Sequence, residues 1–329
     1  MGYKNIPQRV VAARYKNEKI LYKSASGGAY AAIAEYVLRK RGVVFGVVYD
    51  EKWNAFFTYA EKDEQLEPIL SSKYVQADTR DSYAEVKKQL INGRKVLYCG
   101  TGCQIGGLKS YLQKDYDNLI TVDLICHGVT SPLLFRKYIH WLGDKCGALI
   151  TEYDFRDKKG GWGLGYKYKY KYKYKYRNCN LDPYYYHFLK GNAYRECCYK
   201  CNYCSKGRCG DLTIGDYWGI EKEHPDFYST KGVSVLLVNT MKGEKCLEEC
   251  EHLFYLCESS FEKAAKHNYN LQNPTKRNDA IRNIFYDGID YLNFEDLPYI
   301  RKFKPSWASR LKAIAPLRLK LFFKQLHLS

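Results

Sequence analysis

The stretch Arg195–Ile220, RECCYKCNYCSKGRCGDLTIGDYWGI, contains five of the chain's thirteen cysteines within thirteen residues. Three of the five are spaced three apart and two flank them: Cys198, Cys201 and Cys204, with Cys197 and Cys209. A two-residue spacer lets successive sulfur atoms converge around one turn of the chain, as iron–sulfur and zinc sites both require. The spacing therefore predicts a metal or cluster site and leaves the identity of the metal open.

The composition is that of a globular protein, with 329 residues of which 46% are hydrophobic and 27% charged. This length favours about two domains. The first residues have no apolar segment typical of a secretory signal, and no run of 18 apolar residues predicts a membrane span. We therefore expect a cytoplasmic protein whose thiols are reduced, so that its cysteines serve as ligands or buried side chains rather than in disulfides.

The formal net charge of +17 predicts attraction to an acidic protein, an anionic lipid surface or nucleic acid. Much of this charge lies in the segment Tyr166–Tyr176 and in the C-terminal segment Arg301–Lys324. No helix-turn-helix, RNA-recognition or paired Cys/His finger pattern accompanies it, which makes nucleic acid an unlikely partner.

The segment Tyr166–Tyr176 reads YKYKYKYKYKY, the one low-complexity run of the chain. Its period of two predicts a β-ribbon with all lysines on one face and all tyrosines on the other. Such a ribbon could stack on and neutralise a nucleic acid strand. The strict repetition instead favours a dipeptide expansion in a surface hairpin.

The remaining pattern is that of an α/β protein with a mixed or mainly parallel sheet flanked by helices. Continuous apolar runs predict buried strands, and segments of helical period lie between them. The expected strands are 43–49, 95–99, 119–126, the LTIGDYWG segment from 212 and 232–238, and the expected helices are 29–42, 83–92, 133–142, 244–257 and those after Phe261.

We expect three parts: an N-terminal α/β domain over 1–115, a C-terminal domain over 116–299 that carries the cysteine stretch, and a basic amphipathic helical tail over 300–329. In the tail, Leu319, Phe322, Phe323 and Leu326 share one helical face. That face predicts either peripheral membrane contact or docking on the protein's own core.

Two more cysteines follow predicted strands. Cys103 lies in the turn after 95–99, and Cys126 ends the strand 119–126, so both are expected where ligands gather in α/β sheets. The glycines of the first turn do not follow the dinucleotide pattern G-x-G-x-x-G, which weakens an NAD-binding interpretation. A helix N-terminus there is expected to lower the thiol pKa of Cys103. Either cysteine alone could equally be a small buried hydrophobic residue.

Two further groups of polar residues are candidates for cofactor binding or catalysis. Ser24, Ser26, Gly27 and Gly28 form the turn SASGG before an Ala-rich helix, where exposed amides could bind a cofactor phosphate. An ordinary capped turn is the alternative. His127 follows Cys126 and could act as an acid or bond a cofactor, although a single loop histidine is more often structural.

Nine segments in order resemble the coenzyme F420 hydrogenase/dehydrogenase β-subunit family, over about residues 20–300. They are SASGG at Ser24, GVVFGVVY at Gly42, SKYVQAD at Ser72, VLYCGTGCQIGGL at Val96, DLICHGV at Asp123, FRDKKGGW at Phe155, CYKCNYC at Cys198, DLTIGDYWGI at Asp211 and GVSVLLVN at Gly232. The resemblance implies a flavoprotein that binds FAD beside a [4Fe–4S] cluster and passes hydride to or from a deazaflavin or another organic acceptor. Relatives include 7-hydroxymethyl chlorophyll a reductase, and bacterial members are often encoded with surface polysaccharide biosynthesis.

The resemblance also implies roles for residues. The cluster ligands would be Cys103, Cys126, Cys198 and Cys201, with Cys204 as a substitute, and Cys197 and Cys209 would be spectators. His127 is a tentative catalytic residue. The FAD contacts would be Ser24, Ser26, Gly27, Gly28, Gly100, Thr101, Gln104, Arg156, Lys158, Arg195 and Arg208, the last four as positive charges.

Three features depart from the family pattern. The chain lacks the N-terminal ferredoxin-like module of many members, so we expect electrons to come from a separate ferredoxin-like carrier, in an assembly that could be oligomeric. Gly102 replaces a usual proline, which is expected to loosen the turn that presents Cys103. The Tyr/Lys repeat has no counterpart in the family. A different interpretation is a zinc-stabilised, non-enzymatic binding module that uses this ribbon on nucleic acid or an anionic glycan.

Overall fold

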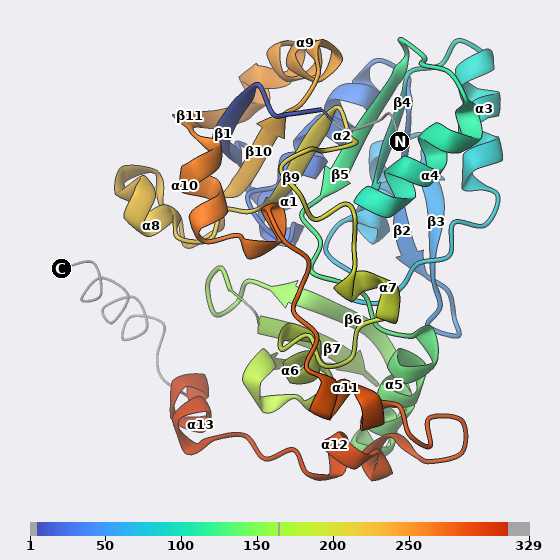
Figure 1. The fold of residues 1–329 in the computed structure, drawn as a ribbon, viewed down its shortest axis with the longest axis vertical. Helices are drawn as coiled ribbons and strands as arrows, with labels where there is room; N and C mark the ends of the chain where they lie inside the picture. Colours follow the sequence, from blue (N-terminus) through green and yellow to red (C-terminus); the bar gives the residue numbers. More distant parts are fainter. Residues whose placement is uncertain (1–4, 164, 315–329) are drawn as a thin grey trace.

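The computed structural model describes residues 5–163 and 165–314, with the side chains of 311–314 excepted. Over this range the chain forms an eight-stranded sheet and a three-stranded sheet, both flanked by helices. The large sheet occupies the upper half of the molecule in Figure 1 and the small sheet the lower half. The predicted α/β class with a mixed sheet is confirmed.

The large sheet has the strand order β11-β1-β10-β9-β5-β4-β2-β3. Its four parallel strands are β2 (Val43–Tyr49), β4 (Val96–Thr101), β5 (Leu119–Leu124) and β9 (Leu212–Asp216). Antiparallel strands extend it on both sides: β3 (Ala55–Ala60), and β10 (Ser234–Val238), β1 (Arg9–Tyr15) and β11 (Phe254–Ser259). The carboxyl ends of the parallel strands therefore share one edge, where α/β proteins bind ligands.

Helices cover both faces of the large sheet. On one face lie α2 (Ala29–Arg39) and α9 (Met241–Cys250), and on the other α3 (Ser82–Ile91), α4 (Gly102–Leu112) and α10 (Phe261–Lys266). Alternate residues of one strand consequently enter different cores: Leu97 packs toward α2, while Tyr98 packs toward α3 and α4. Burial on both faces explains why these strands are continuous apolar runs in the sequence.

The small sheet consists of β6 (Ile150–Asp157), β7 (Gly165–Tyr170) and β8 (Lys173–Asn178) in antiparallel order. An aromatic core joins it to α5 (Pro132–Cys146), α6 (Pro183–Leu189), α11 (Asp279–Phe285) and α12 (Pro298–Arg301). The buried carboxylate of Asp182 accepts hydrogen bonds from the hydroxyls of Tyr138 and Tyr166 and from the amide of Tyr185. It thereby ties α5, β7 and the start of α6 together.

The Tyr/Lys repeat forms the β7–β8 hairpin, but its faces are mixed, contrary to expectation. Lys167 stands opposite Tyr176, and Tyr168 stands opposite Lys175. Residues directly opposite in antiparallel strands share a face. The turn between Tyr170 and Lys173 therefore pairs each tyrosine of one strand with a cation of the other, and the predicted all-lysine face does not exist.

Other sequence predictions need correction or addition. The helix expected over 244–257 ends at Cys250, because the β-prone residues from Phe254 pair with β1 as strand β11. The segment FRDKKGGW begins within β6. The sequence pattern did not predict strands β1 and β3. The remaining helices are α1 (Glu18–Lys23), α7 (Glu196–Tyr199), α8 (Ile220–Glu223) and α13 (Trp307–Ile314).

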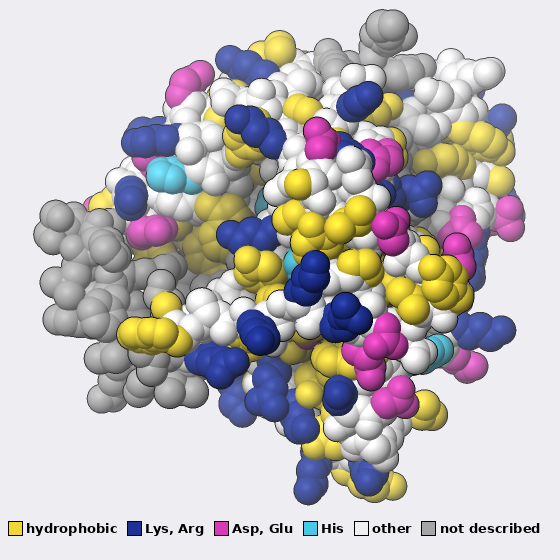
Figure 2. Space-filling model, turned by 60° about the horizontal axis from the view of Figure 1, so that its bottom comes forward, with side chains coloured by type: hydrophobic (Ala, Val, Ile, Leu, Met, Phe, Trp, Pro, Cys, Tyr) yellow, Lys and Arg dark blue, Asp and Glu magenta, His cyan; other side chains and the backbone are white. Residues whose placement is uncertain are grey.

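The boundary expected after residue 115 falls between β4 and β5, which are hydrogen-bonded neighbours in one sheet. Residues on both sides of this boundary therefore build the same core. The segment after Phe261 is helical, as predicted, but the apolar face expected in the tail at 319–326 lies outside the described residues. None of the described helices is long and apolar enough to span a bilayer. Lys and Arg side chains are numerous on the face that carries the small sheet (Figure 2).

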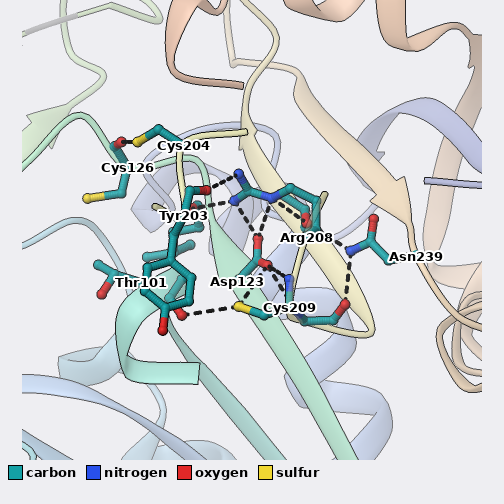
Figure 3. Close-up of polar contacts among 12 residues, drawn as sticks. Thr101, Asp123, Cys126, Tyr203, Cys204, Arg208, Cys209 and Asn239 are labelled. Carbon is teal, nitrogen blue, oxygen red and sulfur yellow. Dashed lines mark hydrogen bonds and ion pairs between the residues drawn. The ribbon is translucent and has the colours of Figure 1, made fainter. Parts of the chain in front are cut away.

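A buried ion pair fastens the cysteine loop to the large sheet. The fully buried carboxylate of Asp123, on β5, accepts hydrogen bonds from Arg208 Nε at 3.1 Å and Nη2 at 2.6 Å (Figure 3). Its second oxygen accepts the backbone amides of Cys209 and Gly210 at 3.1 and 2.9 Å. Arg208 also donates to the carbonyl oxygen of Tyr203, at 3.1 Å. Loop residues 203–210 are thus fixed to the strand that leads to Cys126.

Tyr203 packs on the first two turns of α4, where two glycines leave room for its ring. A Cβ atom on Gly102 would lie 2.8 Å from Cβ of Tyr203, and one on Gly106 would lie 2.4 Å from its hydroxyl oxygen. Cys209 Sγ also donates to the carbonyl oxygen of Gly102, at 3.1 Å. The cysteine loop therefore rests directly on α4, whose second residue is Cys103.

Replacing Arg208 by methionine should strongly destabilise the protein, because it leaves the Asp123 carboxylate buried without its cation. We expect the free energy of unfolding to fall by about 3–5 kcal/mol, measured by urea denaturation. The exposed neighbour Lys206 provides the control, since Lys206→Ala should change it by about 0.5 kcal/mol or less. A loss below about 1 kcal/mol for Arg208→Met would show that the pair does not hold the loop.

The contact between Tyr203 and α4 predicts that Gly106→Ala changes the free energy of unfolding in opposite directions with and without the tyrosine ring. Gly106→Ala should cost about 1–3 kcal/mol of unfolding free energy through overpacking against the tyrosine ring. In a Tyr203→Ala background the same substitution should stabilise by up to about 1 kcal/mol, because alanine is the better helix former. Equal effects in both backgrounds, measured by urea denaturation, would contradict the contact.

Candidate functional site

A cavity of about 580 Å³ opens at the carboxyl ends of the parallel strands. Its wall includes the residues that end or follow three of them, 99–104 after β4, 124–129 after β5 and 214–216 at the end of β9. The SASGG turn and the first residues of α2 form another side, and residues 195–204 close it from the small-sheet side. The volume is within the range of pockets that bind organic ligands and cofactors.

Seven cysteines line this cavity, from three distant segments of the chain. They are Cys103 at the start of α4, Cys126 after β5, and Cys197, Cys198, Cys201 and Cys204 in and after α7, joined by Cys99 from β4. Cys204 Sγ donates to the carbonyl oxygen of Cys126 at 3.4 Å (Figure 3). The cysteine stretch and the two strand-end cysteines thus lie at one cavity. Cys209, by contrast, is buried against Asp123 and the start of α4, outside it.

The thiols are close enough to affect one another's ionisation. Burial raises the pKa of Cys126, and the neighbouring Cys198, Cys103 and Cys201 raise it further. Burial likewise raises the pKa of Cys198 to about 12. The contact between Cys201 and Cys204 lowers the pKa of the Cys201 thiol and raises that of the Cys204 thiol. Among these thiols, Cys201 is the one that most readily becomes a thiolate, the form that binds metals.

The expected low pKa of Cys103 is wrong. Its side chain is open to the cavity, but the protein around it raises the thiol pKa above the usual value. Burial of the thiol is the largest cause of this rise in pKa. Two weaker effects lower the pKa: a hydrogen bond with Thr101 Oγ1, at 3.1 Å, and hydrogen bonds with the amides of the first helical turn.

No three Cys, His, Asp or Glu side chains among the described residues form a group that could hold a metal ion. Around a tetrahedral zinc, four thiolates would stand about 3.8 Å from one another, given Zn–S bonds of about 2.3 Å. The cysteines therefore share a cavity without forming such a compact cage.

The turn that presents Cys103 is held firmly, although glycine replaces the proline usual in the family. Thr101 and Gln104 form a capping box at the start of α4, in which Gln104 Oε1 accepts the amide of Thr101 at 2.9 Å. Gly102 is the first helical residue and packs under Tyr203. The capping box and this packing hold the turn in place, and the looser turn expected from Gly102 stays a prediction.

The SASGG turn meets the cavity through Ser24, Ser26 and Gly28, which precedes α2 with a φ of 77°. Gly27 does not line the cavity. A Cβ atom there would lie 2.3 Å from the carbonyl oxygen of Ala13 and from the amide nitrogen of Ser234, so this glycine allows the turn to pass between β1 and β10.

Lys158 fixes the turn from behind rather than lining the cavity. Its buried Nζ donates to the carbonyl oxygens of Leu21 and Ser26, at 2.7 and 2.5 Å. Burial lowers the pKa of this ammonium group to about 7, with a further lowering from Arg156. The backbone uses two of the three N–H donors of this ammonium group, and its role as a direct cofactor contact stays a prediction.

Of the three arginines predicted to bind the cofactor, two line the cavity but already form ion pairs with carboxylates of the protein. Arg156 makes a bidentate ion pair with Asp216, with distances of 2.6 and 2.8 Å, and Arg208 is engaged by Asp123. Arg195 differs, because it is exposed at the cavity wall and its side chain has no ion pair or side-chain hydrogen bond within the described part of the chain. Of the three, Arg195 is the one whose charge is left for an anionic ligand.

His127 lines the cavity near this charged pair. Burial lowers its pKa, and Arg156 lowers it further, while Asp216 opposes both. The imidazole is therefore neutral at physiological pH. Trp218 also lines the cavity, stacked on Trp162 with ring centroids 5.1 Å apart. The cavity thus combines a neutral proton-transfer group with an aromatic surface.

Lys73 is a cavity residue that no sequence argument singled out. Its Nζ donates to the carbonyl oxygens of Pro68 and Leu70, at 2.8 and 2.7 Å, and burial lowers its pKa to about 8. It positions the loop that carries Tyr74 into the cavity. The signal that could have found it is its place in the segment SKYVQAD, which resembles the family.

Comparison with known proteins agrees with this architecture. Residues 93–264 match the family model that describes the C terminus of the coenzyme F420 hydrogenase/dehydrogenase beta subunit. The fold is similar to that of a chain in the F420-reducing [NiFe] hydrogenase complex from Methanosarcina barkeri, studied by xenon derivatization. The superposition has a TM-score of 0.53 and 16% sequence identity, and covers 82% of this chain and 91% of that chain. No curated protein matches the sequence.

The matched segment is slightly more than half of the chain and contains β4 to α10, with all the candidate cluster ligands. The structural similarity, at this low identity, concerns the fold alone. The family supports a redox role of the kind that hydrogenase and dehydrogenase subunits perform. The chain belongs to the coenzyme F420 hydrogenase/dehydrogenase beta subunit family.

Proposed function

We propose that this protein is an iron–sulfur flavoprotein oxidoreductase. In this proposal Cys103, Cys126, Cys198 and Cys201 bind a [4Fe–4S] cluster, and FAD occupies the adjoining part of the cavity. The observation that carries the proposal is the meeting of thiols from three distant segments at a single cavity, beside the starts of two helices. When bound, the flavin would exchange a hydride with an organic substrate such as a deazaflavin, and single electrons with the cluster.

The thiols fit a cluster better than they fit a single ion. A cluster of four irons spans a wider gap than one tetrahedral ion, and the described cysteines surround a cavity instead of a point. Cys201, with the lowered pKa, would be the first thiolate available to iron. Cys204 is the neighbour that lowers this pKa, and it is the substitute ligand if one strand-end cysteine is not used.

Two helix starts and the charge of Arg195 suit the phosphates of FAD. The first residues of α2 and of α4 both line the cavity, and the amides at a helix N-terminus attract anions. Gly100 and Thr101 allow a ligand to approach the backbone at α4, and Ser26 and Gly28 do so at α2. Arg195 would supply the positive charge for the phosphates, because Arg156 and Arg208 are already paired with Asp216 and Asp123.

His127 is placed to exchange a proton with the substrate. Its neutral imidazole faces the cavity beside the Arg156–Asp216 pair, whose charges nearly cancel. A neutral histidine can accept or return a proton at a heteroatom of the substrate as hydride transfer changes its charge. Tyr74, whose hydroxyl accepts from Arg156 Nη1 at 3.0 Å, fixes that pair in place.

The electrons would leave or enter through a separate one-electron carrier. Cys197 and Cys103 are exposed, which puts the candidate cluster near the surface. A net charge of +17 would steer an acidic carrier toward the protein. A subunit of a larger redox assembly is the arrangement that we expect.

Protein purified without oxygen should be brown and contain about four irons per chain. Serine in place of Cys103, Cys126, Cys198 or Cys201 should reduce the iron content sharply, as measured by metal analysis and visible absorption. Cys257→Ser is the matched control, because this half-buried cysteine on β11 does not line the cavity. Colourless protein with stoichiometric zinc would overturn the proposal.

Arg195→Ala should weaken FAD binding by about tenfold, through loss of a charge-assisted contact with phosphate. The measurement is a fluorescence titration of flavin-free protein with FAD. Lys200→Ala serves as the control, because Lys200 is exposed on the same loop but does not line the cavity. Unchanged affinity in Arg195→Ala, with normal iron content, would remove Arg195 from the flavin site.

A further inference from the structure

The strand β8 forms an open edge of the small sheet. The order of that sheet is β6-β7-β8, and no strand within 5–163 or 165–314 pairs with the outer side of β8. Most of its side chains are exposed, among them Tyr174 at 42% and Tyr176 at 39%, and Tyr172 in the turn before it is 97% exposed. An exposed edge of this kind presents unpaired backbone groups to which another strand can add.

The inner strand of the same hairpin shows what such an addition would look like. Opposite Lys167-Tyr168-Lys169 on β7 stands Glu152-Tyr153-Asp154 on β6, with each lysine facing a carboxylate. Lys169 Nζ lies 2.6 Å from Glu152, and Lys167 Nζ lies 3.8 Å from Asp154. An acidic strand with alternate carboxylates thus complements the Lys-Tyr-Lys pattern in this protein.

The outer strand repeats that pattern without a partner. Lys173-Tyr174-Lys175 on β8 is the same tripeptide, and neither of its lysines has an ion pair within the described part of the chain. We propose that the open edge of β8 binds an extended acidic segment of another polypeptide, which adds as a fourth antiparallel strand. Its alternate carboxylates would face Lys173 and Lys175, and the residue between them would face Tyr174.

The structure favours an acidic strand over other occupants. Lysines on an edge strand repel a basic strand and discourage neutral ones, which is a common protection against aggregation. The mixed faces also argue against a nucleic acid platform, because the β7 lysines are neutralised by β6 and two β7 tyrosines, Tyr166 and Tyr168, are buried. What remains free is the strand edge, and backbone pairing with charge complementarity is how extended peptides add to sheets.

The open edge of β8 belongs to the same sheet as part of the cavity wall. Arg156 on β6 lies in the cavity wall, two strands from β8 in the same sheet. A partner added at β8 would therefore be attached to the sheet that forms part of the site. The inference does not depend on the redox function, since the edge and its charges exist whatever the cavity binds.

The test uses a labelled peptide with the sequence of β6, ITEYDFRD, and fluorescence anisotropy with the full chain at low ionic strength. We expect saturable binding that weakens by about tenfold when the acidic residues are replaced by their amides, ITQYNFRN, because two exposed ion pairs contribute about this much. Two further peptides carry N-methyl groups on alternate residues, in the two possible sets. One set should abolish binding, because only one set of amides points toward β8.

Variants on the protein provide the matched controls. Lys173→Glu combined with Lys175→Glu should abolish binding of ITEYDFRD and create binding of the lysine peptide ITKYKFRK. Lys245→Glu, an exposed change on α9 at the far end of the molecule, should leave ITEYDFRD binding unaltered (Figure 1).

Equal binding of both N-methylated peptides would show simple charge attraction and overturn strand addition. Strand addition would also be overturned if oligothymidylate displaced ITEYDFRD and the protein bound ITQYNFRN with unchanged affinity. Absence of binding to ITEYDFRD would overturn the proposal outright.

Discussion

The site depends on one buried carboxylate. Asp123 lies in the middle of the large sheet with no exposed surface, and four N–H donors satisfy its two oxygens. Burying a charge costs several kcal/mol unless it is paired and hydrogen-bonded, so this arrangement tolerates no missing partner. The pair adds little net stability compared with an apolar contact. What it provides is position, because only one placement of loop 203–210 satisfies both Asp123 and Arg208.

That placement brings the cysteine stretch to the carboxyl edge of the sheet. Strand β5 carries Asp123 and leads to Cys126, while the loop that Asp123 holds comes after Cys201 and contains Cys204. Tyr203 rests on the glycines of α4, the helix that begins beside Cys103. Three segments far apart in sequence are thereby fixed around one cavity. Several charges at the cavity are engaged within the protein: Asp216 pairs with Arg156, and backbone carbonyl oxygens accept from Lys73 in the wall and from Lys158 behind it.

The sequence allowed prediction of the parts of this arrangement that have local signals. The apolar runs of β2, β4, β5 and β10 are buried on both faces, so their composition alone identifies them. The strand-end positions of Cys103 and Cys126 followed from the same pattern and from the general rule for α/β sheets. β11 was missed because its pairing with β1 is nonlocal, and its residues continue a helical pattern in the sequence. The mixed faces of the Tyr/Lys hairpin depend on where the chain turns, which alternation does not reveal.

The roles of the basic residues could not be predicted, because they depend on partners distant in sequence. Arg208 and Lys158 have the composition expected of anion-binding residues, yet Asp123 lies 85 residues away from the first and Ser26 lies 132 residues away from the second. Desolvation of Cys103 is nonlocal in the same way, and it outweighs the local helix effect that the sequence suggested. Where a residue's chemistry is set by its neighbours in space, only the fold assigns it.

The central claim of the proposed function is that these thiols bind one iron–sulfur cluster at the edge of the cavity. The most direct test is X-ray diffraction, at wavelengths on either side of the iron absorption edge, from crystals of protein purified without oxygen. The account predicts an anomalous iron peak between the sulfur atoms of Cys103, Cys126, Cys198 and Cys201. An empty cavity bordered by free thiols in iron-replete protein, or a peak at the zinc edge instead, would contradict it.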